Sequence, residues 1–228
     1  MTALAGKVAV ITGGSGGIGR AIVHALREAG ATALSLDLVD ADVHCDVRDD
    51  ASVARAIAEV EEKFERVDIA VHAAGIARDG VVWKLSVDDW DAVQQVNLRG
   101  AFLLMRHAIP PMRRAGGGRI VLIGSINGSR GKVGTAAYSA SKAGLLGLAK
   151  SVSRETGRFG ICVNVIEPGW VRTPLTEAVA QPIKEAALAE TLLGELVEPE
   201  DVAGAVVFLA AAHRITGQTL RVDAGQYL

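Results

Sequence analysis

Two side chains capable of acid–base chemistry stand four positions apart in the stretch TAAYSASKAG, residues 135–144. Tyr138 carries a phenol, and Lys142 carries an ammonium group. Positions i and i+4 lie on one face of a helix, and the residues around this pair are small, so a bulky ligand could reach both side chains. The stretch is also compatible with a surface helix that carries an unrelated tyrosine and lysine. The rest of the chain has to decide between the two interpretations.

A glycine-rich turn, TGGSGGIG at residues 12–19, follows the first apolar run of the chain. Gly13, Gly17 and Gly19 would let the backbone turn tightly, let a phosphate approach and let the next helix pack on the preceding strand. The N-terminus of that helix would offer N–H groups to a pyrophosphate. Because the turn lies between a predicted strand and a predicted helix, we expect nucleotide binding rather than a plain loop.

Asp37 ends the second predicted strand, 18 residues beyond Gly19. A carboxylate at this place can accept hydrogen bonds from both hydroxyls of the adenosine ribose, and it would repel a 2′-phosphate. Neither the glycine-rich turn nor the neighbours of Asp37 include a lysine or arginine that could neutralise such a phosphate. The sequence therefore predicts NAD, or NADH, in preference to NADP.

Short apolar runs alternate with amphipathic stretches along the whole chain, without a repeat or a linker. This pattern predicts a parallel sheet with helices on both faces, and right-handed crossovers then produce a doubly wound sheet. We therefore expect an α/β fold, a single-domain Rossmann-type sheet over residues 1–228, with ligands beyond the carboxyl ends of the strands. The strands are expected at 7–12, 32–38, 41–47, 68–75, 118–125, 161–168 and 218–223, and the helices at 17–29, 51–65, from 86, 98–114, 137–157 and 199–211.

Composition narrows the function classes. With 228 residues, of which 50% are hydrophobic and 22% charged, the chain is typical of a globular protein. A net charge of −2 and 4% aromatic residues do not indicate nucleic-acid binding. Cys45 and Cys162 match no disulfide framework or zinc spacing, and no run of about 18 apolar residues predicts a membrane span. Since the N-terminal run is too short for a signal peptide, we expect a cytoplasmic protein with no metal and no membrane or nucleic-acid partner.

Taken together, these motifs resemble those of the short-chain dehydrogenase/reductase family. The likeness spans essentially the whole chain, and the 13-residue gap from Ser125 to Tyr138 and the Tyr-x-x-x-Lys spacing are specific. The matching pieces are TGGSGGIG, DV at 46–47, AAG at 73–75, Asn97, Ser125, YSASK at 138–142, PG at 168–169 and VDAG at 222–225.

The resemblance implies a role for each catalytic residue. Tyr138 would be the general acid/base, and Lys142 and the cationic nicotinamide would lower the pKa of its phenol from about 10. Lys142 would also bind the nicotinamide ribose. Ser125 would orient the substrate carbonyl, and Asn97 would hold a water that passes protons toward Lys142. Hydride would then move between the nicotinamide and the carbinol carbon.

The family's cofactor groove can be carried over in the same way, with Asp46 and Val47 bordering the adenine. The residues expected to bind the cofactor are Gly13, Ser15, Gly17, Ile18, Gly19, Asp37, Asp46, Val47, Ala74, Gly75, Tyr138, Lys142, Pro168, Gly169, Val171 and Thr173.

Three features depart from the family pattern. His72 stands where the family has asparagine, and we expect a structural histidine with satisfied hydrogen bonds, with a proton relay as the alternative. Ala224 stands where glycine is common. The stretch between Asp37 and Asp46 is short, so the adenine side of the site is expected to be trimmed.

The sequence is most similar to the β-ketoacyl-ACP reductase and acetoacetyl-CoA reductase branch of the family. This implies reduction of a 3-oxoacyl thioester in fatty acid metabolism, on acyl carrier protein or CoA. An NAD-dependent dehydrogenase of another secondary alcohol (a sugar, a steroid or a small hydroxy compound) and a non-catalytic NAD-binding module remain as alternatives. An acidic carrier or CoA phosphates could contact a set of basic residues, which could equally be a solvated scatter: Arg113, Arg114, Arg130, Lys132 and Arg158.

Two further expectations concern larger parts of the molecule. The segment 170–197 mixes apolar and charged residues and is predicted to form a mobile lid over the substrate. The family resemblance implies a homotetramer. The apolar residues of the helices at 98–114 and 137–157 also exceed what one side of a sheet needs, which predicts an exposed apolar face for a neighbouring subunit.

Overall fold

The computed structural model describes residues 3–177 and 179–228, so residues 1, 2 and 178 of the predicted domain lie outside the described residues. At the centre is a seven-stranded sheet with the strand order β3-β2-β1-β4-β5-β6-β7, and all of its neighbouring strands are parallel. The order reverses between β1 and β4, as in a doubly wound sheet, and the predicted fold class is confirmed. The strands are β1 (Val8–Thr12), β2 (Thr32–Asp37), β3 (Val43–His44), β4 (Ile69–His72), β5 (Gly118–Ile123), β6 (Ile161–Pro168) and β7 (Thr219–Val222).

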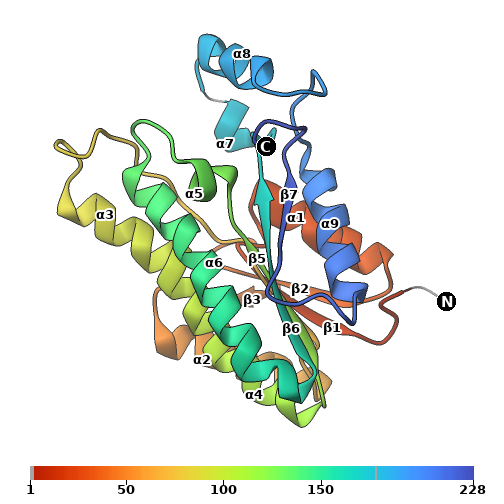
Figure 1. The fold of residues 1–228 in the computed structure, drawn as a ribbon. Helices are drawn as coiled ribbons and strands as arrows, with labels where there is room; N and C mark the ends of the chain where they lie inside the picture. The colour runs from red at the N-terminus through yellow and green to blue at the C-terminus, as the bar shows by residue number, and fades with distance from the viewer. Residues whose placement is uncertain (1–2, 178) are drawn as a thin grey trace.

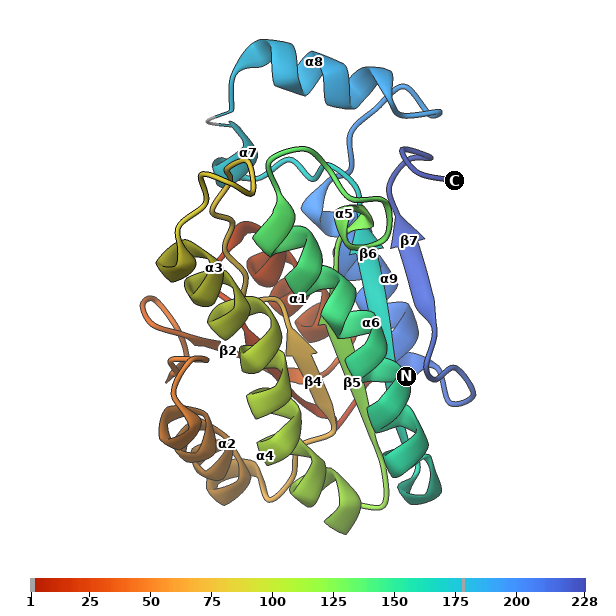
Figure 2. The same ribbon diagram turned by 60° about the vertical axis from the view of Figure 1, so that its left-hand side comes forward.

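Helices cover both faces of the sheet (Figure 1 and Figure 2). Helices α1 (Gly17–Glu28) and α9 (Pro199–Ala211) pack on one face, and α2 (Asp50–Phe64), α4 (Gly100–Arg114) and α6 (Ala136–Thr156) pack on the other. A strand covered on both faces has to be apolar throughout, and all five residues of β1 are buried. The short helices α7 (Pro174–Glu177) and α8 (Gln181–Ala189) lie above the carboxyl ends of the strands, at the top of both views.

The connection from β2 to β3 is unusually short for parallel strands, which normally need a dozen or more residues between them. Residues 38–42 make this crossover, and they form only bends. Strand β3 is correspondingly short, with Val43 opposite Leu36 and His44 opposite Asp37. The strand predicted over 41–47 is therefore reduced to two residues, because so short a connection allows only brief pairing at the edge of the sheet.

The helices predicted from residue 86 and over 98–114 are parts of one continuous helical rod. Ser86 caps α3 (Val87–Gln94) by accepting a hydrogen bond from the Asp89 N–H (3.0 Å). A π-turn, η1 (Gln95–Arg99), then joins α3 to α4 without a break. The sequence does not predict this turn, in which Asn97 lies. The short helix α5 (Ile126–Arg130) and the 3₁₀ turn η2 (Gly157–Phe159) were not predicted either.

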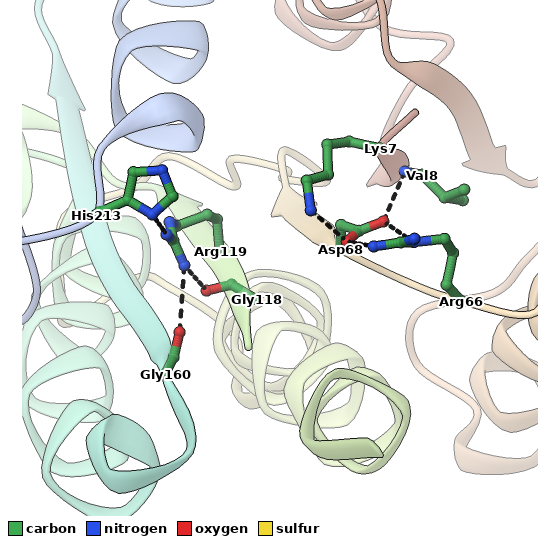
Figure 3. A network of polar contacts seen from close by, with 8 residues as sticks. All are labelled: Lys7, Val8, Arg66, Asp68, Gly118, Arg119, Gly160 and His213. Atoms are coloured by element: carbon green, nitrogen blue, oxygen red, sulfur yellow. Dashed lines mark hydrogen bonds and ion pairs between the residues drawn. The ribbon is translucent and has the colours of Figure 1, made fainter. Parts of the chain in front are cut away.

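Polar networks secure the amino ends of the strands (Figure 3). The buried carboxylate of Asp68 accepts hydrogen bonds from the Val8 N–H (3.0 Å), Lys7 Nζ (3.1 Å) and Arg66 Nη2 (2.6 Å). Burial raises the pKa of Asp68, but these bonds outweigh burial and leave the pKa below its usual value. Arg119 forms a second network, with the carbonyls of Gly118 and Gly160 and with His213. Both networks lie at the amino ends of the strands, whereas the predicted site lies at the carboxyl ends.

Cys45 and Cys162 are free thiols, and both are buried. Within residues 3–177 and 179–228, no cluster of three or more histidine, cysteine or acidic side chains is placed to hold a metal ion. None of the described helices combines the length and the apolar character that a membrane crossing requires.

Candidate active site

The segments that follow β1 and β4 meet at the carboxyl edge of the sheet with no room for a side chain between them. Gly13 has a φ of +69°, and a Cβ atom on it would lie 2.5 Å from the Ala74 nitrogen. Any larger residue at position 13 would therefore separate the two segments. A Cβ on Gly19 would collide with the Gly13 carbonyl oxygen. The two glycines thus hold the start of α1 against the end of β1.

The first turn of α1 is open to an anion. Gly16 stands at the N-cap without a side-chain cap, and this turn contains no acidic residue. Across a narrow gap lies the segment after β6, since a Cβ on Gly17 would come within 3.0 Å of Thr173 Cγ2. Free N–H groups at a helix start, reached through glycines, fit the pyrophosphate of a dinucleotide. Ile18, also predicted to bind the cofactor, is half-buried in the same turn.

Asp37 reaches the glycine-rich turn from the end of β2. Its Oδ2 accepts a hydrogen bond from the Ser15 N–H (3.1 Å), and its Oδ1 accepts one from the Leu38 N–H (2.8 Å). The Ser15 hydroxyl donates to the carbonyls of Val39 (2.9 Å) and Asp40 (2.8 Å), which draws the short 38–42 connection against the turn. The predicted ribose-binding carboxylate therefore lies beside the predicted phosphate-binding turn.

Asp46 and Val47 are less open than the sequence suggests. The Arg48 guanidinium donates hydrogen bonds to both carboxylate oxygens of Asp46, among them one from Nη2 to Oδ2 (2.7 Å) and one from Nε to Oδ1 (2.9 Å). These bonds, chiefly, hold the pKa of Asp46 below its usual value. Val47 is buried, and a Cβ on Gly100 at the start of α4 would lie 3.1 Å from its Cβ. A role of these two residues beside the adenine stays a prediction.

Lys142 is buried although it carries a charge, with only 4% of its surface exposed. Its Nζ donates a hydrogen bond to the Ile123 carbonyl (2.8 Å) and lies 5.6 Å from the centre of the Tyr138 ring. Burial lowers the pKa of Lys142 to about 8. The α6 helix thus brings the tyrosine and the lysine to the end of β5, as their spacing predicts.

The pKa of Tyr138 does not follow the sequence-based expectation. Burial raises it above the usual value, Asp79 raises it further, and hydrogen bonding to Ser125 only partly opposes them. The expected net lowering of this pKa is wrong for the protein alone, because burial dominates. Ser125 is the N-cap of α5, and its Oγ accepts a hydrogen bond from the Asn127 N–H (3.2 Å).

Asn97 joins three parts of the site from the π-turn. Its Oδ1 accepts a hydrogen bond from the Ile76 N–H (2.8 Å), and its Nδ2 donates to the Ile76 carbonyl (3.0 Å) and to Ser141 Oγ (3.0 Å). A Cβ on Gly75 would lie 3.4 Å from Lys142 Nζ and 3.6 Å from Asn97 Oδ1. Asn97 and Lys142 therefore converge on Gly75, beside the proposed path of the cofactor.

The segment after β6 forms the opposite wall. Gly169 donates its N–H to the Val222 carbonyl (2.9 Å), and Val171 is buried. Beyond them, Pro168 ends β6 and Thr173 faces the glycine-rich turn. A cavity of about 270 Å³ lies beneath α7 and α8. The residues that line it include Trp170, Arg172, Thr176, Lys184, Leu188 and Leu196.

The contacts of Gln226 with the segment 170–197 were missed by sequence reasoning. Gln226 accepts a hydrogen bond from the Trp170 N–H (2.9 Å) and donates one to Glu190 at the end of α8 (2.9 Å), so it joins the start of this segment to the end of α8. Arg130 of α5 donates to the same Glu190 oxygen (2.8 Å). No sequence signal marks these contacts, because they join residues far apart in the chain.

The basic residues expected to meet an acidic partner do not form one surface. Arg113 and Arg158 both stack on the Phe159 ring, at 4.0 and 4.7 Å from its centre, near the amino end of β6. Arg114, at the end of α4, is paired with Glu61. Of the five, only Arg130 and Lys132 flank the site. Lys132 Nζ lies 5.3 Å from the centre of the Trp170 ring.

Comparisons with known proteins agree with this geometry. A family model described as Enoyl-(Acyl carrier protein) reductase matches residues 13–226. The 3-oxoacyl-[acyl-carrier-protein] reductase FabG of Escherichia coli (strain K12) is 38% identical, over 98% of each chain. The acetoacetyl-CoA reductase of Synechocystis sp. is 39% identical, over 97% of this chain and 96% of its own. The solved structure of gox2181 is 34% identical, with a TM-score of 0.94 over 98% of this chain and 96% of its own.

The buried ammonium of Lys142 makes a prediction about stability. Between pH 8 and about 10.4, the ordinary lysine pKa, the unfolded chain holds a proton that the folded lysine has released, so the free energy of unfolding should rise with pH. From pH 7.5 to 10, urea unfolding of the wild type should gain about 2 kcal/mol relative to Lys142→Met, which cannot titrate there. If the free energy of unfolding changed with pH by the same amount in both proteins, the lowered pKa of Lys142 would be contradicted.

Proposed function

The chain belongs to the short-chain dehydrogenase/reductase family, and we propose that it uses NADH to reduce a 3-oxoacyl thioester to the 3-hydroxyacyl thioester. It is an enzyme of the short-chain dehydrogenase/reductase type. The observation that carries the proposal is the convergence of Lys142 and Asn97 on Gly75, with the Tyr138 ring 5.6 Å from Lys142 Nζ and Ser125 beside the phenol.

The substrate class rests on relatives that match the chain almost from end to end. Those named 3-oxoacyl-[acyl-carrier-protein] reductase and acetoacetyl-CoA reductase both act, by their names, on a ketone of an acyl thioester. The matching family is described by a different reduction, that of an enoyl group. A hydroxyl and a phenol side by side suit a carbonyl oxygen, which accepts two hydrogen bonds, so the ketone is the favoured substrate. Another secondary alcohol stays as the alternative.

We assign the proton chemistry to the chain's own groups. A bound nicotinamide cofactor supplies the hydride, which adds to the carbonyl carbon. Ser125 donates a hydrogen bond to the carbonyl oxygen and orients it. Tyr138 transfers its phenolic proton to that oxygen as negative charge develops there. The Lys142 ammonium lies close enough to stabilise the phenolate left behind, and Asn97 holds a water from which the proton is restored. Burial, which raises the pKa of Tyr138, favours the protonated phenol from which this transfer starts.

The cofactor site is assigned to the two walls of the groove. One wall is the glycine-rich turn with Ser15 and Asp37, together with Ala74 and Gly75 after β4. The other is the segment from Pro168 to Thr173. We propose that Asp37 selects NADH, because its carboxylate lies beside the turn and would repel a 2′-phosphate. The buried free thiols of Cys45 and Cys162 suit the reducing cytoplasm, where we place this enzyme.

We further propose that residues 170–197 act as the substrate lid of this single domain. The cavity beneath α7 and α8 supports this, and its Trp170 is apolar enough to face an acyl chain. Residue 178 and the side chain of Leu175 lie outside the described residues. Lys132, beside Trp170, is the basic residue best placed to meet a phosphate of CoA or of an acyl carrier protein.

The proposed homotetramer would use part of the expected surface, on α6, but not the residues of α4 that were expected to face a neighbour. Five apolar residues of α4, predicted to face a neighbour, are buried in their own subunit: Ala101, Leu104, Met105, Ala108 and Met112. The unpartnered surface is instead a groove of about 570 Å³ between η1, α4 and α6. Its apolar wall includes Leu98, Leu148 and Phe102, the last 45% exposed. A second copy of the same groove would cover it.

Removing one oxygen tests the proposed catalysis. Tyr138→Phe keeps the ring but loses the transferable proton, so kcat for NADH oxidation with acetoacetyl-CoA should fall by at least about a hundredfold. NADH binding, followed by fluorescence titration, should be retained. Crotonyl-CoA, the enoyl analogue, serves as the control substrate and should not be reduced by the wild type. The proposal would be contradicted if the wild type reduced crotonyl-CoA but not acetoacetyl-CoA, or if Tyr138→Phe kept a near-normal kcat.

Cofactor choice is tested at the end of β2. The wild type should have the higher kcat/KM with NADH. Asp37→Asn keeps a hydrogen-bond acceptor near the Ser15 N–H but removes the charge. The ratio of kcat/KM with NADH to kcat/KM with NADPH should therefore fall by about tenfold or more. Asp37→Ala should in addition weaken NADH binding. Asp40→Asn, in the same connection, is the matched control. A wild type that prefers NADPH would show that Asp37 does not select the cofactor.

Assembly can be tested at one glycine of α6. A Cβ on Gly147 would meet no atom within 4 Å in the subunit, so Gly147→Arg should leave the fold intact but place a charge in the proposed interface. By light scattering at micromolar concentration, the wild type should have about four times the subunit mass of 23.7 kDa, and Gly147→Arg a smaller mass. Glu59→Arg on α2 is the control. An active wild type of one subunit mass would rule out the tetramer.

A further inference from the structure

His72 is a fully buried titratable residue that the proposed mechanism does not use. It is the last residue of β4, and it lies between the end of β1 and the helical rod that carries Asn97. A Cβ on Gly100, directly after the π-turn, would lie 3.2 Å from His72 Cε1. The imidazole is therefore packed between the sheet and the π-turn.

The two ring nitrogens of His72 have different surroundings. Nδ1 lies 2.9 Å from the Thr12 hydroxyl. Nε2 has no hydrogen-bond partner among the described residues, so the expectation of a histidine with satisfied hydrogen bonds is wrong for this nitrogen. Burial chiefly, and then the Lys142 ammonium, lower the pKa of His72 to about 3, while the backbone of Asn97 and Val96 near the ring opposes them. An opposing effect of this kind is that of backbone carbonyl groups that face the ring.

These surroundings determine where the proton lies on the neutral ring. A backbone carbonyl can only accept a hydrogen bond, whereas the Thr12 hydroxyl can donate one. Both interactions are favourable only when Nε2 carries the hydrogen and Nδ1 accepts from Thr12. The Nε2–H is then directed at the π-turn, where the helical hydrogen bonds are already rearranged to i→i+5. A proton relay through His72 would require a cationic ring, which this buried position opposes.

We propose that His72 is a positioning residue: its buried ring, fixed by Thr12 at Nδ1 and packed against Gly100, turns Nε2–H toward the backbone at Val96 and Asn97 and so keeps the π-turn in place. The turn then keeps the Asn97 side chain on Ile76 and Ser141, with its oxygen facing the same space as Lys142 Nζ. Thr12 completes the arrangement by fixing the ring tautomer from β1. The role in turnover rests on the proposed function, but the hold on the π-turn does not.

The test compares three variants with the wild type. His72→Leu has a similar volume but no N–H, His72→Gln retains an N–H, and Val71→Ala opens a cavity in the same strand on the other face of the sheet. Hydrogen exchange of the amides at 96–100 reports on the π-turn without any substrate. Steady-state kinetics with NADH and acetoacetyl-CoA report on the site.

In His72→Leu we expect at least about tenfold faster exchange at 96–100 and a kcat at least about tenfold lower, with KM changed less than about twofold. His72→Gln should recover most of both effects. Val71→Ala should lower the melting temperature without either local effect. Exchange and kcat in His72→Leu that match those of Val71→Ala would overturn the inference.

Two further outcomes keep the test decisive. If the wild type reduces no 3-oxoacyl thioester, the proposed function fails, while exchange at 96–100 still decides the hold on the π-turn. If His72→Leu does not fold, Thr12→Val takes its place, because it removes the donor to Nδ1 and leaves the imidazole. Thr12→Val should then speed exchange at 96–100, and unchanged exchange there would contradict the proposal.

Discussion

The active-site arrangement depends on one hydrogen bond, from the buried Lys142 ammonium to the Ile123 carbonyl. A buried charge is costly unless it is hydrogen-bonded, so this contact decides where α6 can sit against the end of β5. Once α6 is docked there, the phenol of Tyr138 and the hydroxyl of Ser125 share one side of the groove, and Ser141 can meet Asn97. The position of the ammonium group therefore links the packing of the helix with the geometry of the site.

A second constraint is the lack of room at the carboxyl edge. The backbone at Gly13 approaches that of Ala74 so closely that no side chain fits between the two segments. Any side chain at position 13 would push the segments apart and change the shape of the groove. On the adenosine side, the bond between Asp37 and Ser15 draws the 38–42 connection against the same turn. No helix connects β2 to β3, but the glycine-rich turn is still supported. Backbone carbonyl groups of the short 38–42 connection bind Ser15 of the turn directly.

Sequence reasoning predicted what local patterns encode. Alternating apolar runs indicate the strands and most helices to within a few residues, and the Tyr138–Lys142 spacing indicates that both side chains share a face. The π-turn could not be predicted, since QVNLR has the pattern of an ordinary helix and only the tertiary contacts of Asn97 distinguish it. The pairing of Asp46 with Arg48 and the hydrogen bond from Gln226 to Glu190 are likewise side-chain contacts that no spacing specifies. The raised pKa of Tyr138 depends on burial, which one stretch of sequence does not reveal.

Burial shifts the two central pKa values in opposite directions, because the charged form is the phenolate in one case and the ammonium in the other. The phenol of Tyr138 is held in its protonated form, and the ammonium of Lys142, with a pKa of about 8, is less strongly held in its charged form than an exposed lysine. At neutral pH the site thus starts with a proton on the phenol, as a reduction needs. Oxidation of an alcohol would need the phenolate instead, and a rise in pH would favour it. Burial thus favours the uncharged form of both groups, and the hydrogen bond to the Ile123 carbonyl is what opposes it at Lys142.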